Sequence, residues 1–276
     1  MNRKSRGGKL VDKATIIERY KNDDDRLLIS KLLDRIQLAE KQNKIQTTDF
    51  LSPIELQLLK DVLNSLQFNN YEIYGAVENA QRNIIIIYPD KLEKLFNEKL
   101  FDYNTVCSCI KITNNPEYYE HKVYLGGLIK LGIKREKIGD IIITENETDI
   151  IVSKEISKFI LNNLKDLTRF SKSQIEIINL SEVIQKEQEF KGLKIIVSSV
   201  RLDNIVAELA RTSRSKALEL LKQERVFVNY KNETKATKAI QNTDLITIRG
   251  KGKFIIDEIL GNTRSGKYIL IAKKYV

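Results

Sequence analysis

Residues 201–229 read RLDNIVAELARTSRSKALELLKQERVFVN, and this stretch decides the fold of the last third of the chain. Apolar side chains recur at helical spacing in Leu202–Ala210 and again in Ala217–Leu221. Ser213 stands where it can cap the second helix. Because the link between the two segments is very short, the two helices must pack against each other. The strand-like Val226–Asn229 follows, so the pattern predicts a helix pair followed by a strand.

The charged side chains of this stretch are expected to face solvent, because its apolar positions face inward. Further strands are predicted at 245–249, 254–260 and 267–272, with a Gly-spaced basic turn at 249–253 and a second one containing Arg264 and Lys267. Free N–H groups at a helix start, together with Lys and Arg side chains, suit phosphate. The predicted RNA-binding residues are Arg201, Arg211, Ser213, Arg214, Ser215, Lys216, Lys222, Asn229, Arg249, Lys251 and Lys253.

The positive charge of the chain is concentrated in the same region. Residues 191–276 contain 18 Lys and Arg against 8 Asp and Glu, whereas residues 1–190 contain 29 of each. The whole formal net charge of +10 therefore falls in the last 86 residues. A basic segment of domain size is typical of proteins that bind a polyanion.

The rest of the chain predicts helices first and then a mixed layer of helices and strands. Asp23–Lys44 has a helical pattern behind an acidic first turn, and Ser52–Glu55 forms a capping box that begins a helix reaching about Leu66. Beyond these, the predicted strands are 71–76, 83–88, 101–113 and 174–180, with a hairpin at 138–152 and helices at 115–131 and 153–164. This alternation favours an α+β layer of ferredoxin or RRM type. The polar segment 181–192 is the expected boundary before the basic part.

Several classes of function are disfavoured by what the sequence lacks. Cys107 and Cys109 would point to the same face of a strand, and with His121 as the only histidine they supply neither a disulfide nor a zinc site. The longest apolar run, Ile84–Tyr88, is far shorter than the roughly 20 residues that span a bilayer. No Gly-rich nucleotide-binding motif is present. We therefore expect a cytoplasmic protein with no cofactor, no metal and no membrane association.

Two groups of motifs resemble known families. Arg201–Asp203, Ser213–Ala217, Leu221 and Val226–Asn229 resemble the signature of the S4 RNA-binding domain, although Gln223-Glu224-Arg225 stands where that family usually has a glycine. His121–Leu128, Leu131–Ile141 and Ile248–Phe254 resemble motifs of the YlmH family.

The resemblance implies an α+β protein of three domains: a helical N-terminal domain at 1–70, an RRM-like domain at 71–181 and an S4 (αL-motif) domain at 190–276. It implies a non-catalytic bacterial protein that binds the large ribosomal subunit through 23S rRNA, and tRNA. Members of the family are linked to ribosome-associated quality control of stalled nascent chains, and some to cell division. We expect a monomer, with His121, Arg135 and Lys137 as a second RNA contact.

An RNA-modifying enzyme is the alternative interpretation. Pseudouridine synthases carry a similar Arg-Leu-Asp sequence in which the aspartate is catalytic. In this chain the surrounding residues are those that begin an S4 helix, so Asp203 is expected to cap or pair near the helix start instead. A pocket lined by titratable groups near His121 or Asp140 would favour the enzyme.

Overall fold

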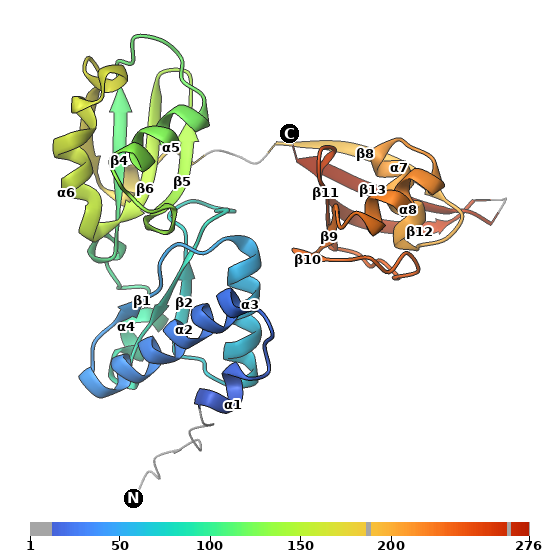
Figure 1. Cartoon of the computed structure of the whole chain (residues 1–276), viewed down its shortest axis with the longest axis horizontal. Coiled ribbons are helices and arrows are strands. Elements are labelled where there is room, and N and C mark those ends of the chain that lie inside the picture. Colours follow the sequence, from blue (N-terminus) through green and yellow to red (C-terminus); the bar gives the residue numbers. More distant parts are fainter. Residues whose placement is uncertain (1–12, 186–188, 264–265, 276) are drawn as a thin grey trace, which may run out of the picture. The chain divides into compact units, whose positions relative to one another are not determined.

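The chain forms two compact units that divide between residues 186 and 187, inside the polar segment 181–192 (Figure 1). This computed structural model describes residues 13–185, 189–263 and 266–275. We refer to the N-terminal unit and the C-terminal unit. Arg264, predicted in a basic turn, lies outside the described residues.

The first half of the N-terminal unit begins with helices, as predicted. The helices are α1 (Lys13–Ile17), α2 (Asp23–Gln42) and α3 (Pro53–Ser65), and α4 (Glu93–Asn97) follows later. Asn22 caps α2, because its side chain accepts the amide hydrogens of Asp24 and Asp25. The predicted capping box is confirmed: Glu55 accepts the Ser52 amide at 2.6 Å, and Ser52 accepts the Glu55 amide at 3.4 Å.

A three-stranded sheet packs with these helices, and two of its strands come from residues after 70. Its strands are β1 (Gln46–Thr47), β2 (Tyr71–Tyr74) and β3 (Ile84–Ile87), in the order β1-β3-β2. All four isoleucines of β3 are buried: Ile85 and Ile87 pack against α2 and α3, whereas Ile84 and Ile86 face the second half of the unit. A strand buried on both faces lacks the alternation of apolar and polar residues. The sequence therefore does not reveal against which elements each face of the strand packs.

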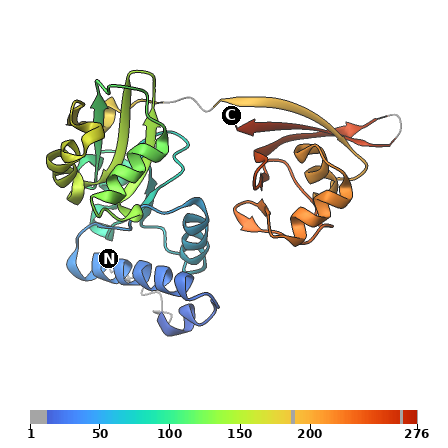
Figure 2. The same cartoon turned by 45° about the horizontal axis from the view of Figure 1, so that its top comes forward.

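The second half of the N-terminal unit is an antiparallel sheet with helices on one face. Its elements are β4 (Cys107–Thr113), α5 (His121–Lys130), β5 (Ile138–Ile143), β6 (Glu147–Ser153), α6 (Lys154–Asn163) and β7 (Gln174–Ile178), with strand order β5-β6-β4-β7. Both helices lie against the sheet (Figure 2), and their buried side chains share one core with it. The strand predicted from residue 101 begins at Cys107, and the helix predicted from residue 115 begins at His121.

The C-terminal unit is a six-stranded antiparallel sheet with two helices packed on it. Its elements are β8 (Phe190–Val197), α7 (Leu202–Ala210), α8 (Arg214–Lys222), β9 (Val226–Val228), β10 (Lys231–Asn232), β11 (Leu245–Ile248), β12 (Gly252–Asn262) and β13 (Tyr268–Tyr275). The strand order is β10-β9-β11-β12-β13-β8. The predicted helix pair is confirmed, and both helices share one core with the sheet. β8 lies partly in the segment predicted as a boundary.

Candidate RNA interface

A buried carboxylate holds two arginines at the surface of the C-terminal unit. Asp203, in the first turn of α7, is fully buried. The Arg214 side chain donates to it from Nε at 2.9 Å and from Nη2 at 2.7 Å. Arg201 donates from Nε at 3.2 Å and from Nη2 at 3.1 Å. The Arg201 side chain remains 38% exposed and the Arg214 side chain 55% exposed. Both guanidinium groups are therefore fixed in place yet open to a ligand.

The electrostatics of this triad favour the charged form of the carboxyl group. Burial of Asp203 opposes ionisation, but the hydrogen bonds from Arg214 and Arg201 outweigh it and hold the pKa of Asp203 below its ordinary value. The triad therefore carries one net positive charge. Charge-assisted, forked guanidinium bonds of this kind fix geometry as well as charge. The expectation that Asp203 pairs near the helix start is confirmed.

The other residues predicted on the helix pair are close to Arg214 in sequence, and all are exposed. Ser213 caps α8 by accepting the amide hydrogen of Lys216 at 3.2 Å, which leaves the first amides of α8 at the surface. Lys216 also binds Glu219 at 2.6 Å, so part of its charge is neutralised. Arg211, Ser215 and Lys222 are exposed. We call Arg201, Arg211, Arg214, Lys216 and Lys222 the α7–α8 cations.

The predicted residues of the strands lie elsewhere on the unit and differ in environment. Asn229 is engaged in its turn, because its side chain donates to Asp244 at 2.7 Å and accepts the Leu245 amide at 2.9 Å. Arg249 and Lys251 are exposed. Lys253 is half-buried beside aromatic rings, and this burial lowers its pKa.

The three residues predicted as a second RNA contact lie in the N-terminal unit, and two of them are engaged there. Lys137 binds Asp49 at 2.6 Å and Glu155 at 2.5 Å. Arg135 donates to the backbone oxygens of Ile138 at 2.6 Å and Gly139 at 3.3 Å.

His121 is the third of these residues and is exposed at the start of α5. Its pKa is lowered, first by partial desolvation of the ring and then by the charge of Arg135. At neutral pH, the His121 ring therefore adds little positive charge.

An RRM-like domain would use the sheet face opposite α5 and α6 to stack on bases. In this chain, the first half of the unit covers that face. Cys107, Cys109 and Ile151 on that face pack with Phe50 and Ile84 from the first half of the unit. Burial raises the pKa of the Cys107 thiol to about 12, so it stays protonated. Farther along the same strands, Lys111 pairs with Glu147 at 2.7 Å. This face is covered at one end and occupied by an ion pair at the other, which does not suit base stacking.

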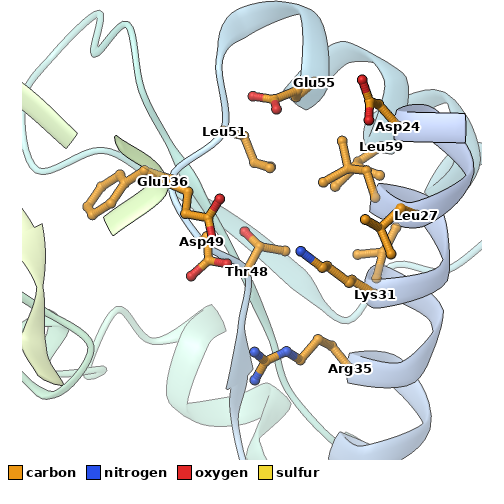
Figure 3. Close-up of a pocket in the computed structure, with 13 residues that line it drawn as sticks. Asp24, Leu27, Lys31, Arg35, Thr48, Asp49, Leu51, Glu55, Leu59 and Glu136 are labelled. Carbon is orange, nitrogen blue, oxygen red and sulfur yellow. The ribbon is translucent and has the colours of Figure 1, made fainter. Parts of the chain in front are cut away.

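A pocket of about 290 Å³ lies in the first half of the N-terminal unit, between α2 and the segment leading into α3 (Figure 3). Lys31 extends from α2 toward Thr48, and Leu27, Leu51 and Leu59 also line the pocket. Two of its carboxylates have structural roles, since Glu55 caps α3 and Asp49 binds Lys137. Neither His121 nor Asp140 lines this pocket.

The described residues form neither a metal site nor a membrane-spanning helix. They contain no group of three or more His, Cys, Asp or Glu side chains placed to hold a metal ion. Among the same residues, no helix is long and apolar enough to cross a membrane.

The aromatic surroundings of Lys253 and Arg249 were not predicted. Phe227 stands between two buried valines of β9, and this alternation is a signal that it faces outward. Tyr230 and Tyr275 lie beside Lys253 only because strands distant in sequence pair in the sheet.

Comparison with known proteins supports the resemblance seen in the sequence. The family model described as "Putative RNA-binding domain in YlmH" matches residues 97–182. The ribosome-associated protein quality control protein P2 of Bacillus subtilis (strain 168) is 28% identical over 245 residues, which cover 89% of this chain and 93% of that protein. The cell division protein ylmH from Streptococcus pneumoniae matches 60% of this chain and 98% of its own, at 20% identity and a TM-score of 0.46.

Proposed function

This chain belongs to the YlmH family, and from that premise we propose that it is a non-catalytic RNA-binding protein acting on the ribosome. Its main RNA contact is the surface formed by the α7–α8 cations in an S4-type (αL-motif) C-terminal domain. The observation that carries this proposal is Asp203 holding Arg201 and Arg214 at the surface of the unit in which the net charge is concentrated. Fixed, half-exposed guanidinium groups beside a helix start suit the phosphates of folded RNA.

The domain that includes residues 97–182 adds a second RNA contact in this proposal. Its order of elements, β4-α5-β5-β6-α6-β7, is the order of ferredoxin-like and RRM domains. The sheet face opposite α5 and α6 is covered by the first half of the unit. The proposed contact therefore lies on the other surfaces of the domain, near His121. Arg135 and Lys137 position the backbone and neighbouring elements there.

The partners follow from the family and the homologue. We propose that the chain binds the large ribosomal subunit through 23S rRNA, together with tRNA, as a cytoplasmic monomer. Because the Bacillus subtilis relative is named for ribosome-associated quality control, we place this chain in the rescue of stalled nascent chains. A link to cell division is part of the proposal because some members of the family have one.

The geometry of Asp203 argues against the alternative of a pseudouridine-synthase-like enzyme. A catalytic aspartate must reach the substrate, whereas Asp203 is fully buried and accepts four hydrogen bonds from Arg201 and Arg214. Its carboxylate is saturated and closed to RNA.

The proposal is tested by the variant Arg211→Gln/Arg214→Gln/Lys222→Gln in the full chain. Glutamine at 214 keeps one donor for Asp203 while removing charge. We expect binding to purified large subunits and to deacylated tRNA to weaken by about tenfold or more, and the slope of log K against log[salt] to fall by about 2. The matched control is Lys41→Gln/Lys44→Gln/Lys91→Gln, three exposed lysines outside residues 97–182. Equal affinity of both variants at near-physiological salt would overturn the proposal.

A further inference from the structure

A row of aromatic and basic side chains crosses the outer face of the C-terminal sheet. Val226 and Val228 of β9 and Ile246 and Ile248 of β11 point into the core shared with α7 and α8. Because successive side chains of a strand point to opposite faces, Phe227 and Thr247 face the other way. They are direct cross-strand neighbours, and Thr247 is in turn paired with Lys253 of β12.

The row continues across the last two strands. The Lys253 ammonium lies 4.6 Å from the ring centroid of Tyr275 on β13, and Tyr275 is paired with Phe190 on β8. The rings of Tyr275 and Phe190 meet edge to face, with centroids 5.0 Å apart. The sheet row, which we define as Phe227, Thr247, Lys253, Tyr275 and Phe190, thus spans five strands, or about 19 Å at the usual strand spacing.

Two further contacts add to the sheet row. The Arg249 guanidinium lies 4.8 Å from the ring centroid of Phe227, and Lys253 lies 5.2 Å from that of Tyr230. Tyr230 follows Asn229 in the turn between β9 and β10, and both residues have positive φ, of 64° and 49°.

Such a turn normally takes glycine at its second position, since a side chain there is strained. Tyrosine at this position adds a ring to the row at a cost in backbone strain. Strain of this kind concentrates at functional sites.

We propose that the sheet row and Tyr230 bind unpaired RNA nucleotides by base stacking. Aromatic rings interleaved with cations on an open sheet face are the features with which proteins bind single strands: the rings stack on bases, and Lys253 and Arg249 attract the backbone. Phe190 is 42% exposed, so at least one ring offers a large free surface. The charged side chains at the row, Lys253 and Arg249, are both basic, which suits RNA. This inference rests on the proposed RNA-binding function, but it concerns the sheet face opposite α7 and α8.

Stacking can be tested with a fluorescent reporter, because the chain contains no tryptophan. In Phe190→Trp the single indole would lie in the sheet row. The matched control is Phe159→Trp on α6, where the original phenylalanine is 46% exposed and belongs to the N-terminal unit. We expect decauridylate to quench the emission of Phe190→Trp and to leave that of Phe159→Trp unchanged. Binding is followed separately by the fluorescence anisotropy of labelled decauridylate. If the emission of Phe190→Trp stays unchanged at concentrations where this binding is saturated, or if the wild-type chain does not bind decauridylate, the proposal is overturned.

Affinity measurements separate this surface from the α7–α8 cations. Tyr230→Gly relieves the left-handed backbone, so the variant should fold, and we expect it to bind decauridylate about tenfold more weakly while binding a ten-base-pair RNA duplex like the wild type. Tyr230→Phe keeps the ring and should bind like the wild type. Arg211→Gln/Arg214→Gln/Lys222→Gln should instead weaken duplex binding. Wild-type affinity of Tyr230→Gly for decauridylate would contradict stacking, whereas unchanged duplex binding by the triple variant would contradict the proposed function.

Discussion

Asp140 in the N-terminal unit and Asp203 in the C-terminal unit each lie close to two arginines, yet their pKa values shift in opposite directions. The Asp203 pKa is lowered, because Arg214 and Arg201 donate four hydrogen bonds directly to it. The Asp140 pKa is raised by desolvation, and its carboxylate accepts the backbone amides of Gln81 and Arg82.

The arginines beside Asp140 are directed to other partners. Arg82 donates to the backbone oxygens of Ile138 and Phe50, and Arg135 donates to those of Ile138 and Gly139. The Arg82 guanidinium joins the two halves of the N-terminal unit and that of Arg135 holds its own turn, whereas those beside Asp203 keep donors available at the surface. Similar residue types therefore stabilise the fold in one unit and present charge for binding in the other.

The largest expected effect comes from removing both arginines of the triad. Arg201→Met/Arg214→Met leaves the buried Asp203 charge without a partner, so we expect the free energy of unfolding to fall by about 4 kcal/mol. Adding Asp203→Leu should restore most of that loss, because an apolar core replaces the ion pairs, while RNA binding stays weak. Urea unfolding and RNA titration measure the two quantities. Lys216→Met, which breaks only an exposed pair, should cost less than about 1 kcal/mol. If Arg201→Met/Arg214→Met were as stable as Lys216→Met, the arginines beside Asp203 would not be needed to balance its buried charge. The contrast with the arginines beside Asp140 would then be wrong.

The opposite pKa shifts predict opposite effects of pH on stability. The pairing of Asp203 stabilises the fold above the ordinary carboxyl pKa of about 4 and is lost as pH falls through its lowered folded pKa. For Asp140, the folded state binds its proton more tightly, so its contribution declines as pH rises from about 4 through the raised folded pKa. The stability difference between wild type and Asp203→Asn should therefore grow with pH, and that between wild type and Asp140→Asn should shrink. Parallel trends in unfolding experiments from pH 3 to 7 would contradict the assigned directions.

A smaller effect is expected at the turn where the sequence departs from the S4 pattern. Glu224 has φ of 55°, a left-handed conformation that favours glycine. Glu224→Gly should raise the free energy of unfolding by about 1 kcal/mol and, by removing a negative charge near the α7–α8 cations, slightly strengthen RNA binding. Glu219→Gly, inside α8, should instead cost about 1 kcal/mol. If Glu224→Gly also lowered stability, strain at this turn would not be relieved by glycine.

Sequence reasoning succeeded where local signals agree and failed where distant segments decide. Ser213, the apolar spacing of α7 and α8, and the Ser52–Glu55 box carry their own structural information, and all three predictions are confirmed. The placement of Ile84–Ile87 could not be read locally, because burial on both faces removes alternation. The internal partners of Lys137 also lie far away in sequence, at Asp49 and Glu155. Arg135 and Lys137 therefore resembled a solvated basic loop.

The most direct test of the central claim is to map crosslinks between the full chain and RNA in purified large ribosomal subunits. If the α7–α8 cations form the main contact, ultraviolet crosslinks will concentrate in peptides from residues 201–222, and Arg211→Gln/Arg214→Gln/Lys222→Gln will remove most of them. Crosslinks confined to residues 97–182, with none in 201–222, would contradict the account and make the N-terminal unit the principal RNA-binding surface.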